Sequence, residues 1–227
     1  MNKEKILKCL KWFFNSFIWL GVLLLFLDIL SKNLVIANKE EILSKGGIVL
    51  IPNFLRINYV INENIAFGIS LGSALATQIV FSILAIIIVG VIIFFLAKKW
   101  DNVNKYYRAC FMMIIAGAIG NVIDRLFYSA SYLDMGGATG VVDWIDFYTI
   151  WGFNFNIADS AVVVAAFMLI IYMVIEEIME YIKNKPAREK IKAEEDETKV
   201  LSKTELEKQK LLEESKENND PKDNNNK

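Results

Sequence analysis

Residues 74–97 read ALATQIVFSILAIIIVGVIIFFLA. This stretch would be apolar on nearly every side of a helix, whereas a surface helix of a soluble protein carries its apolar residues on one stripe. At about 24 residues it can cross a hydrocarbon core of roughly 30 Å. The stretch therefore predicts a transmembrane helix and an integral membrane protein.

Three further apolar runs accompany it, and together they predict an all-α membrane bundle of four helices at about residues 12–32, 74–97, 107–127 and 157–180. The first run is too long for a cleavable signal peptide, and no small-residue cleavage site follows it. We take residues 1–182 as the membrane body and 183–227 as a charged cytosolic tail that is partly helical or disordered. A partner-binding helix is the alternative for the tail.

Basic residues set the expected orientation. They gather before the first run, between the second and third, and after the fourth, at Lys3, Lys5, Lys8, Lys11, Lys98, Lys99, Lys105, Arg108, Lys183, Lys185 and Arg188. The positive-inside rule then predicts a multi-pass protein of the cell membrane with both termini in the cytosol. The connections that follow the first and third helices would lie outside.

The first of these outer connections has the pattern of a small β-sheet. Residues 54–61 alternate in the manner of a strand, and the apolar run 46–51 precedes them. Pro52 and Asn53 between the two runs are typical turn residues. We therefore expect a small extracytoplasmic sheet, or cradle, in this connection.

Composition excludes several classes of function. The formal net charge of −1 offers no field that would attract nucleic acid. The absence of histidine removes the commonest metal ligand and the usual general base, so no metal site and no cofactor is expected. Cys9 and Cys110 would both lie near cytosolic helix ends, where a disulfide is not expected.

Three aspartates lie within the predicted helices, where an ionisable group is costly and marks a functional site. The helical rise of 1.5 Å places Asp124 roughly 22 Å, and Asp28 and Asp159 roughly 25 Å, from the inner boundary. All three would therefore share one plane just below the outer surface.

Two carboxylates in a poorly hydrated place share a proton, so that a water between them meets both a base and an acid. Asp124 and Asp159 could form such a pair, in the manner of an aspartic protease. Alternatively, Asp124 could pair with Arg125 or Arg108, and Asp159 could cap its helix. Asp28 and Lys32 are at i and i+4 and are expected to pair as structural residues.

Four motifs resemble those of the bacterial lipoprotein signal peptidases, also called signal peptidase II. They are DILSK at 28–32, GNVIDRL at 120–126, VVDWIDFY at 141–148 and FNIADSA at 155–161. They occur in the family's order and on the predicted helices. The resemblance implies that Asp124 and Asp159 are catalytic and that Asp143 is, like Asp28 and Lys32, a structural polar residue.

The resemblance also implies a substrate-binding or orienting role for four further residues: Asn62, Asn121, Arg125 and Asn156. It implies the peptide antibiotic globomycin as an inhibitor. The chain departs from the family at residues 62–67, NENIAF, where Asn64 and Ile65 replace glycine and alanine. Extra residues at 128–140 are a second departure, and the tail is a third.

The sequence therefore predicts a monomeric intramembrane aspartic endopeptidase that removes the signal peptide before the lipidated cysteine of diacylglyceryl prolipoproteins. Membrane lipids would be further partners. A proton- or cation-coupled transporter is the alternative from another class, because membrane carboxylates also mark ion pathways. A serine–lysine peptidase built on Ser31 and Lys32 is a second alternative, but adjacent helical residues face different ways.

Overall fold

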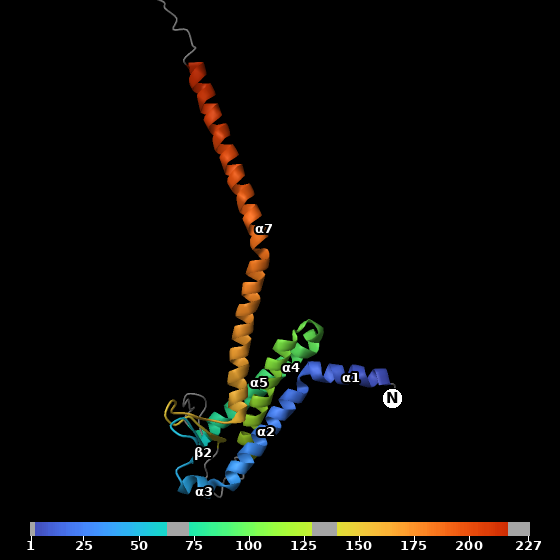
Figure 1. The fold of residues 1–227 in the computed structure, drawn as a ribbon, viewed down its shortest axis with the longest axis vertical. Helices are drawn as coiled ribbons and strands as arrows, with labels where there is room; N and C mark the ends of the chain where they lie inside the picture. Colours follow the sequence, from blue (N-terminus) through green and yellow to red (C-terminus); the bar gives the residue numbers. More distant parts are fainter. Residues whose placement is uncertain (1–2, 63–72, 129–139, 218–227) are drawn as a thin grey trace, which may run out of the picture. The chain divides into compact units, whose positions relative to one another are not determined.

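The computed structural model describes residues 3–62, 73–128 and 140–217. The chain divides into two compact units, Met1–Tyr172 and Met173–Lys227. Within the described ranges, four helices are long and apolar enough to cross a membrane: Ile18–Ala37, Leu75–Asn102, Lys105–Phe127 and Ile157–Pro186. With a four-stranded antiparallel sheet beside them, they confirm the predicted fold class (Figure 1).

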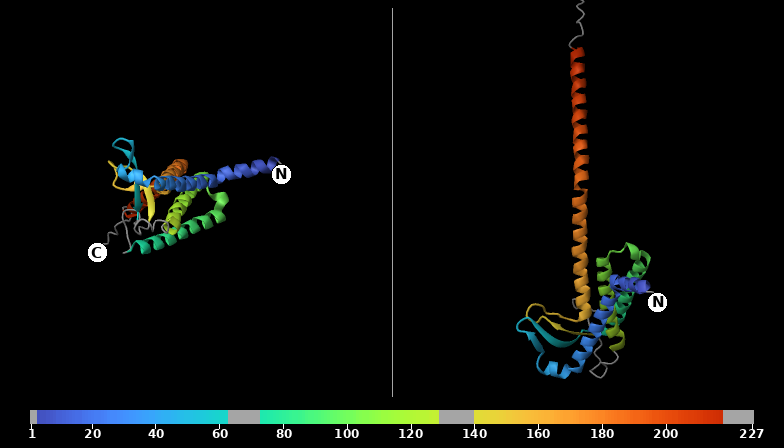
Figure 2. Two further views of the ribbon diagram at one scale, coloured as in Figure 1. Left: turned by 90° about the horizontal axis from the view of Figure 1, so that it is seen from below. Right: turned by 45° about the vertical axis from the view of Figure 1, so that its right-hand side comes forward.

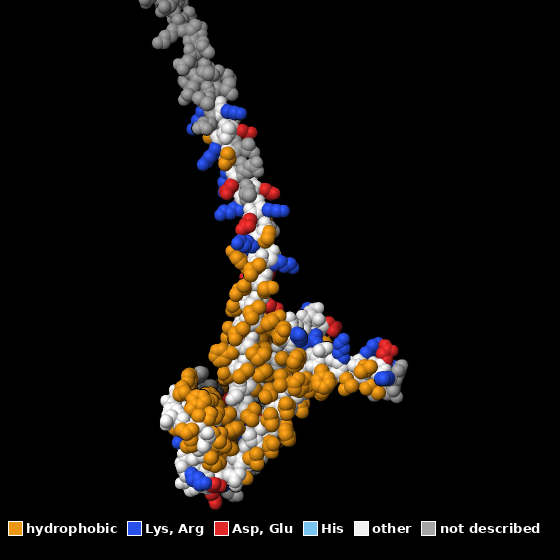
Figure 3. Space-filling model, viewed as in Figure 1, with side chains coloured by type: hydrophobic (Ala, Val, Ile, Leu, Met, Phe, Trp, Pro, Cys, Tyr) orange, Lys and Arg blue, Asp and Glu red, His pale blue; other side chains and the backbone are white. Residues whose placement is uncertain are grey.

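The spanning helices begin and end at local signals. Helix α4 (Ala74–Lys99) begins at Ser73, whose hydroxyl accepts a hydrogen bond from the amide of Ala76, and ends in the 3₁₀ turn η2 (Trp100–Asn102). Asn104 caps α5 (Lys105–Ile123) in the same way. Figure 3 shows hydrophobic side chains covering the bundle, as expected of a surface that faces lipid.

The first helical segment is broken at Phe17. Helix α1 (Lys3–Ser16) ends there, and α2 (Ile18–Ala37) begins in a different direction (Figures 1 and 2). Phe17 has a φ of 58°, a left-handed conformation that is uncommon for a bulky residue. The first membrane helix was expected to start at about residue 12, whereas the helix long enough to span begins at Ile18.

The sheet combines segments from two separate connections. Strands β1 (Ile48–Ile51) and β2 (Leu55–Asn62) are the predicted hairpin, with Asn53 at a φ of 56° in its turn. β2 also pairs with β3 (Val141–Asp146), which pairs with β4 (Asn154–Phe155). The sheet is thus larger than the sequence pattern predicted, and β3 brings Asp143 beside Asn62.

A small apolar core fixes the sheet to the end of α2. It consists of Val35 on α2, Ile42 on the short helix α3 (Lys39–Ser44), Tyr59 on β2 and Val142 on β3. The sheet and α3 lie at one end of the first unit, and α1 and the α4–α5 turn lie at the other (Figures 1 and 2).

Two glycines on α5 allow unusually close packing at the sheet end. A Cβ on Gly117 would lie 2.4 Å from the carbonyl oxygen of Ala158, and one on Gly120 would lie 2.7 Å from Oδ2 of Asp28. Both distances are shorter than the contacts that real Cβ atoms make with other heavy atoms. The first turn of α7 and the end of α2 therefore approach α5 where it has no side chains.

Helix α7 (Ile157–Glu217) contains Pro186 and extends through most of the charged tail. Residues 218–227, for which disorder was predicted, lie outside the described residues, as do Asn64, Ile65 and nearly all of the insertion at 128–140.

Candidate active site

Lys32 lies between two buried carboxylates. Its Nζ is 2.7 Å from Oδ2 of Asp28, which confirms the predicted i, i+4 pair, and 3.0 Å from Oδ2 of Asp124. All three side chains are at most 3% exposed. A buried charge is stabilised only when it is paired, so Lys32 compensates the charges of both aspartates.

Asp28 joins three helices. Besides Lys32 on its own helix, it binds the first turn of α7, because its Oδ1 accepts the backbone N–H of Ala158 at 2.8 Å. Its carboxylate also occupies the space that Gly120 leaves open on α5. A carboxylate is favourable at a helix N-terminus, so Asp28 also fixes where α7 begins.

Asp124 lies where α5 changes into a single π-helical turn, η3 (Asp124–Tyr128). Turns of this kind often occur at functional sites. Its Oδ2 accepts the backbone N–H of Val142 at 3.2 Å in addition to the Lys32 ammonium. The cation bound to Asp124 is thus Lys32, rather than the Arg125 or Arg108 that sequence alone left open.

Asn156 and Asp159 form a reciprocal cap at the start of α7. Oδ1 of Asn156 accepts the backbone N–H of Asp159 at 2.8 Å, and Oδ2 of Asp159 accepts the backbone N–H of Asn156 at 3.3 Å. This is the geometry of a capping box, with asparagine and aspartate in the usual two positions. Asp159 therefore does cap its helix, and its second carboxylate oxygen remains for other contacts.

Asn121 links Asp159 to the buried cation. Its Nδ2 donates to Oδ1 of Asp159 at 2.7 Å, while its Oδ1 lies 3.4 Å from Nζ of Lys32. Because Lys32 also binds Asp124, a continuous polar path runs from Asp124 through Lys32 and Asn121 to Asp159. The two aspartates singled out from the sequence thus belong to one network.

Asn156 extends this network to the sheet. Its Nδ2 lies 3.2 Å from Oδ1 of Asn121 and 2.7 Å from Oδ1 of Asp143. Both asparagines that were predicted to orient the site therefore contact Asp159. The link from Asn156 to Asp143 was not foreseen from the sequence.

Asp143 is held by two side-chain amides. Asn62 donates to its Oδ2 at 2.8 Å, and Asn156 donates to its Oδ1. The pKa of Asp143 is raised from 3.8 to about 7, first by burial and then by the charge of Asp159, against the lowering effect of both donors. This carboxyl therefore holds a proton far more readily than an ordinary aspartate.

Arg125 contributes positive charge to the same cluster. Its partly buried guanidinium interacts electrostatically with Asp159, Asp124 and Asp143. All of the sequence-predicted site residues thus converge at one place: Asp28, Lys32, Asn62, Asn121, Asp124, Arg125, Asp143, Asn156 and Asp159. Among the aspartates of this cluster, Asp159 is only partly buried, whereas Asp28, Asp124 and Asp143 are buried.

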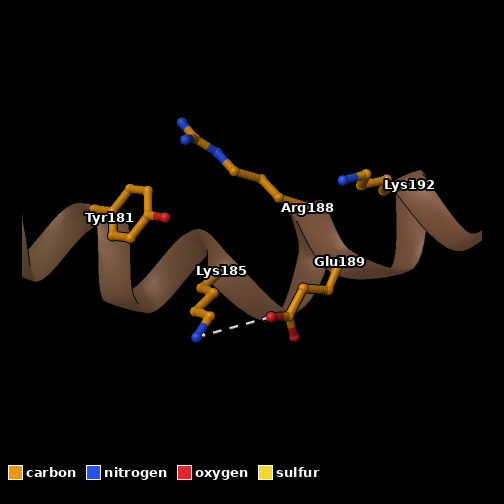
Figure 4. Close-up of a pocket in the computed structure, with 5 residues that line it drawn as sticks. All are labelled: Tyr181, Lys185, Arg188, Glu189 and Lys192. Atoms are coloured by element: carbon orange, nitrogen blue, oxygen red, sulfur yellow. Dashed lines mark ion pairs between the residues drawn. The ribbon is translucent and has the colours of Figure 1, made fainter.

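A surface hollow in the second unit contains none of these residues. It is lined by one helix only, through Tyr181, Lys185, Arg188, Glu189 and Lys192 (Figure 4). Lys185 and Glu189 form an i, i+4 ion pair of 3.8 Å that is largely exposed. This arrangement is that of a solvated charged helix face.

Comparison with known proteins gives a consistent result. The family model described as signal peptidase II matches residues 20–175. The lipoprotein signal peptidase of Fusobacterium nucleatum is 37% identical over 156 residues, which cover 68% of this chain and 84% of that protein. The lipoprotein signal peptidase of Clostridioides difficile is 34% identical over 161 residues, or 71% of this chain and 96% of that one.

Two solved bacterial membrane enzyme structures, determined in meso at 2.3 Å and 1.9 Å resolution, have the same fold. Their TM-scores are 0.54 and 0.53 at 27% and 29% identity. The matches cover 70% and 69% of this chain, and 88% and 90% of those chains. The family match spans well over half of the chain and contains all of the polar cluster. The chain is therefore a multi-pass membrane protein that belongs to the signal peptidase II family.

Proposed function

We propose that this protein is an intramembrane aspartic endopeptidase that removes the signal peptide of diacylglyceryl-modified prolipoproteins by cleaving before the lipidated cysteine. Family membership supports the substrate class. The observation that carries the chemistry is the polar path that connects Asp124 to Asp159 through Lys32 and Asn121. Two carboxyl groups held in one network can divide the tasks of base and acid between them.

The catalytic pair in this proposal is Asp124 with Asp159. Within the described residues, both contacts of Asp124 are made by Oδ2, so Oδ1 is available to bind a water molecule. Asp159 is the more accessible partner and is held in place by Asn121 and Asn156. In this proposal Oδ1 of Asp124 holds the water molecule and the Asp159 carboxyl group is fixed by two donors, which is the division of roles that an aspartic peptidase requires.

The contact with Lys32 favours Asp124 as the base in this proposal. A carboxylate beside a cation stays ionised, and the Lys32 ammonium lies 3.0 Å from Asp124. The proposed starting state has Asp124 ionised and the proton of the pair on Asp159. Asp28 shares the same ammonium and serves as structural support.

The proposed reaction has two stages. Asp124 draws a proton from the water molecule, whose oxygen attacks the carbonyl carbon that precedes the lipidated cysteine. Asp159 donates a hydrogen bond to the carbonyl oxygen and stabilises the developing oxyanion. The C–N bond then breaks as the proton held by Asp124 passes to the leaving amine. The products are a carboxylic acid on the signal peptide and a free amine on the cysteine.

Neighbouring residues would orient the participants. Asn121 and Asn156 position the carboxyl group of Asp159, and Asn62 holds Asp143 beside them. Arg125 supplies a positive charge that can hold a backbone carbonyl near the scissile bond. The diacylglyceryl group would lie against the apolar bundle surface, where phospholipid also binds.

The proposed orientation places both termini in the cytosol and the active site near the extracytoplasmic surface. Lys98, Lys99 and Lys105 flank the α4–α5 turn, at the end opposite the sheet. Positive residues favour the cytosolic side, so the sheet end faces outward. The same side is where exported lipoproteins present their cleavage site. Globomycin is the proposed inhibitor, and the enzyme is proposed to act as a monomer.

The test uses purified full-length protein in bilayers with a diacylglyceryl prolipoprotein. Asp124→Asn and Asp159→Asn should remain folded and inserted, and each should lose at least about a hundredfold in cleavage rate. Asp146→Asn is the matched control, because Asp146 is a buried aspartate that pairs with Arg56 at 2.6 Å instead of joining the network. It should retain most of the activity.

The Asp28→Asn variant tests whether Asp28 has a structural role and not a catalytic one. This variant should lose thermal stability, while the folded fraction cleaves with the wild-type pH profile. Processing at the wild-type rate by Asp124→Asn or Asp159→Asn would refute the proposed pair. Failure of the wild-type enzyme to cleave any lipidated precursor would refute the peptidase itself, and resistance to globomycin would refute the proposed inhibitor.

A further inference from the structure

Helix α1 is held in a fixed direction relative to α2. The hydroxyl of Ser16 donates to the carbonyl oxygen of Phe13 at 2.7 Å and accepts the backbone N–H of Ile18 at 3.2 Å. It thus bonds to the last turn of α1 and to the first residue of α2, with the left-handed Phe17 between them. The indole of Trp19 donates to the carbonyl oxygen of Phe14 at 3.2 Å. These contacts join the end of α1 to the start of α2.

An aromatic contact joins α1 to the turn between α4 and α5. The ring centroids of Trp12 and Trp100 lie 6.0 Å apart, and the guanidinium of Arg108 lies 4.5 Å from the Trp100 ring centroid. Trp100 belongs to η2, at the turn between two spanning helices. Trp12 therefore lies on the side of α1 that is nearer to η2, although it remains 52% exposed, and the opposite side of α1 points away from η2.

That opposite side is a row of large apolar side chains. It consists of residues spaced by three and four positions, each at least 37% exposed: Ile6, Leu7, Leu10, Phe13 and Phe14. The other half of the helix carries Lys5, Lys8 and Lys11. Helices with one apolar face and one lysine-rich face lie in the boundary between lipid headgroups and acyl chains. Figure 3 shows the apolar surface of the bundle continuing along α1.

We propose that α1 is a membrane-surface helix that binds anionic phospholipid headgroups of the leaflet at the α4–α5 end of the bundle. The apolar row enters the upper acyl region of that leaflet, and the lysines bind the headgroup phosphates. The position of α1 requires this leaflet, because only Phe17 separates α1 from the spanning helix α2. Helix α1 has four lysines and one glutamate, Glu4, because Lys3 adds to the three lysines named above, and this excess of positive charge sets the preference for anionic lipid.

Spin labels on the full-length protein test the proposal. The exposed thiol of Cys9 is removed by Cys9→Ser, and Cys110 is retained because it is 1% exposed. Labels are then placed singly by L10C on the apolar row and K8C on the lysine side. A third label at L23C, on the exposed surface of α2, reports correct insertion. The proteins are reconstituted in vesicles of phosphatidylglycerol and phosphatidylcholine, and relaxation by oxygen and by an aqueous nickel complex is measured.

Position 10 should be reached by oxygen and protected from nickel, and position 8 should show the reverse. In phosphatidylcholine alone, nickel access at position 10 should rise severalfold, while position 23 stays protected. Equal nickel access at positions 8 and 10 in the anionic vesicles would overturn membrane binding. Equal protection of position 10 in both lipids would overturn the headgroup preference. Spin–spin broadening at position 10 would identify a second copy as the occupant and would also overturn the proposal.

Discussion

Nδ2 of Asn121 lies 2.7 Å from Oδ1 of Asp159, and this bond joins α5 to the first turn of α7. Asn121 precedes Asp124 by three residues, so the two side chains lie on the same face of α5. The amide that holds Asp159 is therefore carried by the helix that ends at Asp124. One short segment of α5 thus sets how the two proposed catalytic carboxyl groups lie relative to each other.

Asn156→Ala should lower the cleavage rate by more than its effect on stability implies. Loss of a helix cap costs about 1 kcal/mol, and the displaced Asp159 carboxyl group should lower kcat by about a hundredfold. Asn104→Ala is the control, because Asn104 caps α5 at the end opposite the cluster. Thermal unfolding and kcat are measured for both. Equal losses of kcat in the two variants would show that Asn156 acts only as a cap.

Lys32→Met should destabilise the protein strongly. The change leaves the carboxylates of Asp28 and Asp124 buried without their cation, which costs about 3–5 kcal/mol. Adding Asp28→Asn should recover part of the loss, because one of the two stranded charges is removed. Unfolding in detergent is the measurement.

Lys45→Met provides the comparison for Lys32→Met, since Lys45 forms an exposed pair with Glu41. Its effect on stability should be small, because an exposed ion pair contributes little to folding. A Lys32→Met protein as stable as wild type would contradict the buried network described above.

The raised pKa of Asp143 predicts a pH dependence of stability. Between pH 3.8 and about 7 the folded protein holds a proton on Asp143 that the unfolded chain has released. The stabilisation is complete below this window and is lost as the pH rises through it, so Asp143→Asn should flatten the slope. Thermal unfolding of both proteins from pH 4 to about pH 8 is the measurement. A slope that is equally steep in the variant would contradict the buried, protonated carboxyl.

Gly117→Ala should separate α5 from the start of α7. The added methyl group would lie 2.4 Å from a backbone oxygen, which cannot move aside as a flexible side chain could. We expect a loss of about 1–3 kcal/mol of stability, together with lower activity. Gly90→Ala on α4 is the control, because a Cβ there meets nothing within 4 Å. Indistinguishable melting temperatures for the two variants would show that the close packing does not contribute to stability.

The spacing of residues close together in the chain was sufficient to predict much of this structure. Apolar run lengths predicted the four spanning helices, and i, i+4 spacing predicted the Asp28–Lys32 pair. Alternation predicted the β1–β2 hairpin. Each of these features depends on residues close together in the chain, so its pattern is visible without the fold.

The contacts between residues far apart in the chain could not be predicted from the sequence. The bond of Lys32 to Asp124 and that of Asn156 to Asp143 depend on how helices and strands meet. Asp143 was expected to be only structural, yet it shares Asn156 with Asp159. The alternation of VVDWID was a strand signal that could have placed Asp143 on the sheet beside Asn62.

The sheet combines strands from two connections that lie far apart in the chain. This arrangement bears on when, during synthesis, the polar cluster can first assemble. β2 is synthesised well before β3, because Asp143 follows its partner Asn62 by 81 residues in the chain. Asp159 arrives later still, with the first turn of α7. Under the proposed function, a chain that has not yet reached Asp159 has no catalytic pair, even with three helices already inserted, so an unfinished copy cannot cleave the exported proteins around it.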